Sequence, residues 1–230
     1  MPAKTVVFFN KKGGPGKTTL SMNVAATLAL DARVLVIDAD PQASATKWFN
    51  AAPESRPFPV PVVGYSQGKV NLTVQKFAPS HDFIVVDTPP SALAENMITR
   101  SALLVADLAV IPVVPSPLDL WQALEVKTLL LDVNTMRESV DLPPLPARLV
   151  LNRLQAGTVL GRDVQEVLAE FDIPLFETMV HQRQIYARSV VDGCSVHQAG
   201  RDAAPACEEM RSLTAEIVEA LHGEKKRRRS

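Results

Sequence analysis

The sequence predicts one doubly wound α/β domain, in which helices cover both faces of a mainly parallel β-sheet. Short apolar runs rich in β-branched residues suit buried parallel strands, and they occupy residues 4–9, 33–38, 83–87, 108–114 and 148–152. Helical patterns lie between most of these runs, notably at residues 19–30, 119–137 and 161–171. Because strands and helices alternate, the carboxyl ends of the strands should meet at one edge of the sheet, where functional residues gather in this architecture.

Length and composition fit a single domain with its own core. The chain has 230 residues, of which 47% are hydrophobic and 21% are charged. No repeat or long linker divides it, so we expect one domain over residues 1–223. The proline-rich stretch at residues 53–61 is expected to be a surface loop inside this domain, and residues 224–230 to be a basic tail.

The sequence also indicates a cytoplasmic protein. No apolar run approaches the roughly 18 residues that cross a bilayer, and the first residues lack the charged and then apolar profile of a signal peptide. Two cysteines, Cys194 and Cys207, form neither a metal-ligand spacing nor a disulfide framework. We therefore expect both to be free thiols in a reducing compartment.

Charge is distributed unevenly along the chain. The 24 basic and 25 acidic residues give a net charge of −1, but the last seven residues hold five of the basic side chains and one of the acidic ones. Residues 1–223 therefore carry 19 basic and 24 acidic residues, a net charge of −5. A basic tail on an acidic body suggests a polyanionic partner, although a solvated, disordered end explains the tail equally well.

A phosphate-binding loop follows the first strand candidate. The run Asn10-Lys11-Lys12-Gly13-Gly14-Pro15-Gly16-Lys17-Thr18-Thr19 matches the pattern G-x-x-x-x-G-K-[ST], except that a lysine stands in the first glycine position. Glycines let backbone N–H groups approach a phosphate, and the helix that starts after them favours an anion at its N-terminus. The residues expected to bind the nucleotide are Gly13, Gly14, Pro15, Gly16, Lys17, Thr18 and Thr19.

Three of these residues have separate expected roles. Lys17 would neutralise the β- and γ-phosphates, and the Thr18 hydroxyl would ligate Mg²⁺. Pro15 has no N–H to donate, so its backbone nitrogen should not face a phosphate. The sequence therefore predicts an ATP site with Mg²⁺.

Carboxylates stand at the ends of the next two apolar strand candidates. Asp38 and Asp40 follow the run at residues 34–37, and their i, i+2 spacing places both on one side of an extended backbone. Asp87 follows a second apolar run in the same way. Any one of them would ordinarily be explained as a turn or cap residue. Three of them at successive strand ends after a phosphate loop indicate instead the metal-binding half of a phosphoryl-transfer site.

With these motifs together, the chain resembles the ParA/MinD family of ATPases, whose deviant Walker A loop contains an additional lysine. The resemblance covers nearly the whole chain and is closest to the short plasmid-partition ATPases of the ParF type. It rests on five segments, which are residues 12–19, 38–42, 84–90, 115–119 and 182–186.

The resemblance implies a role for each candidate residue. Lys12 would be the signature lysine, which reaches across an ATP-sandwiched homodimer to the phosphates of the partner subunit. Asp40 would position or activate the attacking water, Asp38 would support the metal shell, and Asp87 would be the Walker B carboxylate. Asn152 stands where relatives recognise adenine, although a turn asparagine at a strand end is the simpler alternative.

Electrostatics gives an independent reason to expect that Lys12 serves another site. A second ammonium roughly 4–6 Å from Lys17 in a partly hydrated pocket would cost on the order of 3–4 kcal/mol of repulsion if both bound the same nucleotide. Supplying Lys12 to a neighbouring active site avoids this repulsion and makes the closed dimer depend on ATP.

The favoured function is therefore a dimerising ATPase that binds nonspecific DNA and segregates or positions a cargo. Such a protein would associate with the nucleoid when ATP is bound, and a ParB-like or cargo-adaptor protein would activate its hydrolysis. DNA binding of this kind needs basic side chains that face phosphates, although each alone is ordinarily a solvated charge. The candidates are Arg183, Arg188, Arg201, Arg211 and the tail at residues 225–229.

Two alternatives remain within the same fold. A MinD-like membrane switch would use the helically spaced Met210, Leu213, Ile217 and Leu221 together with the basic tail, but such a stripe ordinarily packs on the core of its own domain. A redox relative would need cysteines that bridge a cluster between subunits, and none precedes Cys194. We therefore expect that membrane binding is not the main function.

Overall fold

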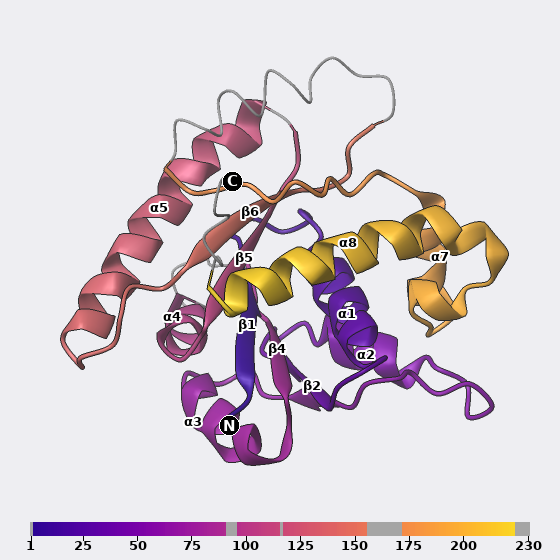
Figure 1. Ribbon diagram of the computed structural model, residues 1–230, viewed down its shortest axis with the longest axis horizontal. Helices are drawn as coiled ribbons and strands as arrows, with labels where there is room; N and C mark the ends of the chain where they lie inside the picture. The colour runs from indigo at the N-terminus through magenta and orange to yellow at the C-terminus, as the bar shows by residue number, and fades with distance from the viewer. Residues whose placement is uncertain (1, 91–95, 116, 156–171, 224–230) are drawn as a thin grey trace, which may run out of the picture.

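The computed structural model describes residues 2–90, 96–115, 117–155 and 172–223. The helix expected at residues 161–171 and the basic tail at residues 224–230 lie outside the described residues. Within the described part, the chain forms a single α/β domain with a six-stranded parallel sheet, so the predicted fold class is confirmed (Figure 1).

The sheet has the order β3-β2-β4-β1-β5-β6. All five predicted strands are present within one or two residues of their expected ends. A further strand, β3, has only three residues and lies at one edge of the sheet, too short for an apolar pattern to reveal it. The strands are β1 (Lys4–Phe8), β2 (Val34–Asp38), β3 (Val62–Gly64), β4 (Phe83–Asp87), β5 (Leu108–Val113) and β6 (Ala147–Leu151).

Helices cover both faces of this sheet (Figure 1). One face carries α1 (Lys17–Leu28), α2 (Ser44–Asn50), α7 (Gln184–Val191) and α8 (Ala204–Leu221). The other carries α3 (Val70–Phe77), α4 (Asn96–Leu104) and α5 (Pro117–Glu138). Short 3₁₀ turns occupy Ala78–Ser80, Val196–Gln198 and Arg201–Ala203.

The strands are apolar throughout because both of their faces are buried. In β1, Val6 and Phe8 belong to the core beneath α1 and α8, whereas Val7 belongs to the core on the opposite face, beneath α3, α4 and α5. All three side chains are fully buried. This alternation explains why the sequence shows continuous apolar runs rather than an alternation of polar and apolar residues.

The apolar stripe of α8 belongs to the core. Met210, Leu213, Ile217 and Leu221 are all buried and pack with α1. The stripe is therefore not an exposed membrane-binding face. Among the described helices, none combines the length and the apolar character that a bilayer span requires.

The proline-rich stretch at residues 53–61 has no regular helix or strand, as predicted, but it is not wholly at the surface. Phe58 and Val60 are buried, and the Phe58 ring meets Trp48 of α2 edge to face at a centroid distance of 6.0 Å. The prediction of a surface loop was wrong for these two side chains, because the loop closes the core beside α2.

Candidate nucleotide-binding site

The candidate site lies at the carboxyl ends of the strands, as the fold class predicts. A pocket of about 290 Å³ opens there. The loop after β1 and the first turn of α1 contribute Gly13, Gly14, Gly16, Lys17, Thr18 and Thr19 to its lining. Segments that are distant in the sequence contribute Asp40, Ser44, Trp48, Pro90, Arg153 and Val190.

The backbone of the loop requires its glycines. Gly14 and Gly16 have φ angles of 94° and 95°, which residues other than glycine rarely adopt. Gly16 is also the N-cap of α1, so the N–H groups of the loop lie beside the positive N-terminal end of the helix. This geometry suits the binding of an anion.

Asn10 anchors the start of the loop. Its amide Nδ2 donates to the carbonyl oxygen of Pro112 in β5 at 2.7 Å, and its Oδ1 accepts from the backbone N–H of Lys12 at 3.2 Å. The side chain is buried. Asn10 therefore fixes the backbone of Lys12 relative to the sheet, a role that no sequence pattern indicated.

Asn152 anchors the end of the loop. Its Nδ2 donates to the carbonyl oxygen of Pro15 at 2.7 Å, and a β-carbon at Gly16 would come within 2.1 Å of the same nitrogen. Asn152 is only 4% exposed, and Pro15 is buried as well. Asn152 thus supports the loop in this structure, while its expected contact with adenine stays a prediction.

Lys17 is folded over the loop. Its ammonium donates to the backbone carbonyl of Lys12 at 3.0 Å, and its side chain is buried. Burial lowers the pKa of Lys17, and the nearby carboxylates of Asp87 and Asp40 partly oppose this effect. A bound phosphate would supply the negative charge that favours the protonated amine.

Lys12 lies at the tip of the loop and is exposed, in contrast to Lys17. The structure therefore separates the two lysines, one inside the pocket and one towards solvent. An exposed cation at this position is what a role in a neighbouring subunit requires, and the ATP-sandwiched dimer itself stays a prediction.

Thr18 and Asp87 meet at the centre of the site. The Thr18 hydroxyl donates to Asp87 Oδ2 at 2.6 Å, while Asp87 Oδ1 is buried and has no hydrogen-bond partner within the described part of the chain. The pKa of Asp87 is raised to about 7, mainly by burial; the hydrogen bond from Thr18 opposes this rise and the nearby Asp38 adds to it.

These oxygens fit a Mg²⁺ ion. Mg²⁺ prefers hydroxyl, carboxylate and water oxygens, and it usually takes only one or two ligands from the protein when phosphates supply others. No group of three or more His, Cys, Asp or Glu side chains with metal-binding geometry occurs among the described residues. A cation at Thr18 and Asp87 would therefore complete its shell with nucleotide oxygens and water.

Asp38 organises the neighbouring loop. Its Oδ2 accepts from both the backbone N–H and the hydroxyl of Thr46 at 2.8 Å, and its Oδ1 accepts from the N–H of Asp40 at 3.2 Å. Both oxygens are thus engaged with the protein, and any support for the metal would be indirect. Asp40 lines the pocket and accepts from the N–H of Gln42 at 2.9 Å.

The arginines expected to bind DNA differ in their exposure and in their contacts within the domain. The Arg183 guanidinium donates to Glu209 through Nε at 3.1 Å and Nη2 at 2.8 Å, so it is engaged within the domain. Arg188 is largely exposed and approaches Asp192 at 3.6 Å, and Arg211 and Arg201 are exposed as well. Contact of these residues with DNA stays a prediction.

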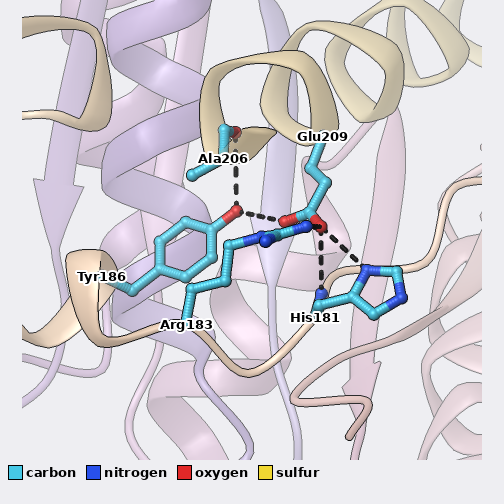
Figure 2. A network of polar contacts seen from close by, with 5 residues as sticks. All are labelled: His181, Arg183, Tyr186, Ala206 and Glu209. Atoms are coloured by element: carbon cyan, nitrogen blue, oxygen red, sulfur yellow. Dashed lines mark hydrogen bonds and ion pairs between the residues drawn. The ribbon is translucent and has the colours of Figure 1, made fainter. Parts of the chain in front are cut away.

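Glu209 is the centre of a polar network between α7 and α8 that the sequence did not reveal. Figure 2 shows His181, Arg183 and Tyr186 converging on its carboxylate. His181 Nδ1 lies 2.8 Å from Oε1, and the Tyr186 hydroxyl donates to Oε2 at 2.8 Å. Burial favours the neutral form of Glu209, but these hydrogen bonds outweigh it and lower its pKa.

The sequence profile of a family described as the CobQ/CobB/MinD/ParA nucleotide binding domain matches residues 6–196. The protein named "Maintenance of carboxysome distribution protein A" of Halothiobacillus neapolitanus is 36% identical over 217 residues, covering 94% of this chain and 97% of that protein. A protein of the same name from Gloeobacter kilaueensis is 31% identical over 217 residues, with coverages of 93% and 94%.

The fold is also similar to a solved structure, an ATP complex of a variant of McdA from Cyanothece. The TM-score is 0.73 and the sequence identity 17%, over 94% of this chain and 96% of that one. At this identity the likeness concerns the fold alone.

Proposed function

This chain belongs to the CobQ/CobB/MinD/ParA family of nucleotide-binding domains, and we propose that it is an ATPase that positions a cargo through an ATP-dependent dimer on nonspecific DNA. The observation that carries this proposal is the buried pair of Thr18 and Asp87 beneath a phosphate loop, with Lys17 and Asp40 at the same pocket. Residues 1–223 would act as the ATPase domain, and the basic tail at residues 224–230 would follow it.

Binding of the nucleotide would use the loop and its two anchors. The N–H groups of the loop and of the first turn of α1 would hold the phosphates, while the Lys17 ammonium would leave the Lys12 carbonyl for the β- and γ-phosphates. The buried Oδ1 of Asp87, which has no hydrogen-bond partner among the described residues, and the Thr18 hydroxyl would hold Mg²⁺. When bound, Mg²⁺ would neutralise charge that develops on the phosphate oxygens.

Hydrolysis would depend on Asp40. Its carboxylate lines the pocket, and the N–H of Gln42 and the link from its own N–H to Asp38 fix its orientation. A carboxylate held in this way orients a water molecule for attack on the γ-phosphate. We expect slow turnover until a partner protein completes the site.

Lys12 would join two subunits through the nucleotide. Its ammonium would reach the phosphates of the neighbouring subunit, so that the dimer closes with ATP and opens after hydrolysis. This cycle would time the residence of the protein on DNA in the cytoplasm. Arg188, Arg201 and Arg211 are the exposed cations that we propose for contacts with DNA phosphates, whereas Arg183 is engaged with Glu209.

The proposed cargo is a protein microcompartment. Two relatives named for the maintenance of carboxysome distribution align with more than nine-tenths of the chain and support this choice. A ParB-like or cargo-adaptor protein would link the dimer to the cargo and accelerate hydrolysis. Segregation of a plasmid or chromosome is the alternative use of the same ATP cycle.

The dimer can be tested by size-exclusion chromatography with light scattering, in the presence of Mg²⁺ and either ATP or ADP. We expect a dimer with ATP and a monomer with ADP. Lys12→Ala should stay monomeric with ATP while still binding it. Lys11→Ala is the matched control, because Lys11 is the adjacent lysine. Its ammonium lies 3.4 Å from Oε2 of Glu125 rather than in the pocket. An ATP-dependent dimer of Lys12→Ala would contradict the proposed mechanism.

DNA binding can be tested with duplexes of unrelated sequence at increasing salt. Affinity should require ATP and fall by orders of magnitude between about 50 and 200 mM salt, because several phosphate contacts release counterions. Binding that is independent of ATP, or insensitive to salt, would count against DNA as the surface on which the protein moves.

A further inference from the structure

Arg153 combines an unusual backbone conformation with a place at the candidate site. It follows Asn152 at the end of β6, has a φ angle of 56°, and lines the pocket beside the phosphate loop. Only three other non-glycine residues in the described part of the chain have positive φ angles, and two of these are aspartates, which tolerate the left-handed region. Arginine has no such local advantage.

The surrounding structure holds Arg153 in this conformation. The N–H of Asn152 donates to the carbonyl of Val113 at 2.8 Å, and the N–H of Leu154 donates to the carbonyl of Val180 at 3.1 Å. The backbone is therefore fixed on both sides of Arg153. A non-glycine residue in this region is strained, and such residues concentrate at binding and catalytic sites.

The turn at the end of β6 places Asn152 and Arg153 in different surroundings. Asn152 points inward and donates to the Pro15 carbonyl at 2.7 Å, whereas Arg153 is exposed at the pocket. No hydrogen bond or ion pair joins the Arg153 guanidinium to any other residue in the part of the chain that the structure describes. A guanidinium at the mouth of a phosphate-binding pocket is well suited to an anionic ligand.

We propose that Arg153 is a nucleotide-binding residue that contacts the diphosphate part shared by ADP and ATP; this inference rests on the proposed function. Its neighbour Asn152 meets Pro15 and Gly16 at the end of the phosphate loop. In loops of this kind the available backbone N–H groups hold the α- and β-phosphates, and Pro15 itself has no N–H to contribute. The γ-phosphate is left to Lys17 and, from the partner subunit, to Lys12, while Asp40 orients the attacking water beside it.

The test compares ADP and ATP binding by titration calorimetry of the full chain with Mg²⁺. Arg153→Asn removes the charge but tolerates a positive φ angle, so the fold should survive without a lower melting temperature. We expect the Kd for ADP and the Kd for ATP each to rise about tenfold, with their ratio unchanged. Arg153→Lys keeps a cation and should recover most of this loss.

Arg33→Asn is the matched control. Arg33 precedes β2 at the opposite ends of the strands, where it pairs with Asp82 at the surface, so its loss should leave both dissociation constants within twofold. Dissociation constants of Arg153→Asn within twofold of the parent, or a loss confined to ATP, would overturn the inference. If the parent protein binds neither nucleotide, the proposed function fails instead.

Discussion

The Thr18 hydroxyl and the Asp87 carboxylate are joined by a hydrogen bond of 2.6 Å, although 69 residues separate them in the chain. The contact forms because β1 and β4 are adjacent parallel strands, so that the residues following β1 meet the last residue of β4. The second oxygen of Asp87 remains buried without a hydrogen-bond partner in the described part of the chain. The centre of the site is therefore arranged for a ligand and is unfavourable for the ligand-free fold.

Asp87→Asn should change how stability depends on pH in the absence of nucleotide and Mg²⁺. The folded pKa of Asp87, about 7, lies above the unfolded value near 4. The folded state therefore binds the extra proton between these values, and the stability of the parent protein falls as pH rises from about 4 to 7. The variant lacks this contribution and should gain on the order of 2–4 kcal/mol relative to the parent at pH 8 compared with pH 4.

Urea unfolding of both proteins at several pH values between 4 and 8 measures this difference. Curves of free energy against pH that run parallel would show that burial does not hold a proton on Asp87. Thr18→Val provides a second check, because it removes the hydrogen bond that lowers the pKa and should move the transition to higher pH.

Local patterns were sufficient to predict the strands and the residues at their ends. Buried parallel strands are apolar on both faces, so β1, β2 and β4 stand out in the sequence, and Asp38 and Asp87 are conspicuous at their ends. The loop was recognisable because its glycines and Lys17 have fixed spacing. The expectation that these motifs gather at one edge of the sheet is confirmed with the fold.

Contacts between distant segments could not be predicted in the same way. Asn10 and Asn152 anchor the two ends of the loop through partners 102 and 137 residues away, and an isolated asparagine carries no sign of such a partner. Arg153 looked like an ordinary charge after a strand, because a φ angle leaves no mark in the sequence of a non-glycine residue. Arg183 looked exposed and basic, but its partner Glu209 lies on another helix.

Asp38→Asn should slow hydrolysis more than it weakens nucleotide binding. One oxygen of Asp38 accepts two hydrogen bonds from Thr46, and the other accepts from the N–H of Asp40. An asparagine can replace only one of these acceptors, so the position of Asp40 becomes less defined. We expect kcat for ATP to fall about tenfold or more, with the Kd for ADP within threefold of the parent.

Steady-state ATPase assays and ADP titration separate these two effects. Thr46→Val is the matched variant on the other side of the contact, since it removes one donor and keeps the side-chain shape; it should reduce kcat in the same direction but less. An equal loss of ADP affinity would indicate that Asp38 supports the whole pocket rather than the position of Asp40.

Gly16→Ala should destabilise the domain through two separate terms. The φ angle of 95° is strained for alanine, and the added β-carbon would come within 2.1 Å of the Asn152 amide nitrogen. We expect a loss of about 2–4 kcal/mol, together with loss of ADP binding. Gly13→Ala is the control, because no atom of the described residues lies within 4 Å of its added β-carbon, and its melting temperature should be close to that of the parent.

A double-mutant cycle isolates the steric term. In an Asn152→Ala background the clash with the amide is gone, so Gly16→Ala should cost about 1–2 kcal/mol less than it does in the parent. Additive losses from the two substitutions, measured by chemical unfolding, would mean that the backbone strain at Gly16 accounts for the whole effect.

Glu209→Ala should destabilise the packing of α7 on α8. The carboxylate is the common acceptor for His181, Arg183 and Tyr186, and its side chain is only 11% exposed (Figure 2). Its removal leaves the Arg183 charge without its acceptor and the Tyr186 hydroxyl with only the long contact to the Ala206 carbonyl at 3.5 Å, which should cost about 2–4 kcal/mol. Thermal and urea unfolding measure the loss directly.

The stabilisation that Glu209 gives the parent protein should depend on pH. Because the folded pKa of Glu209 is lowered, its stabilisation is present above the unfolded pKa, near 4, and is lost as pH falls through the folded value. Glu208→Ala is the matched control, since Glu208 is the adjacent, exposed residue of α8, and it should change stability by no more than about 0.5 kcal/mol. Equal effects of the two substitutions would mean that the network contributes only surface charge, and that packing of apolar side chains alone holds α7 beside the site.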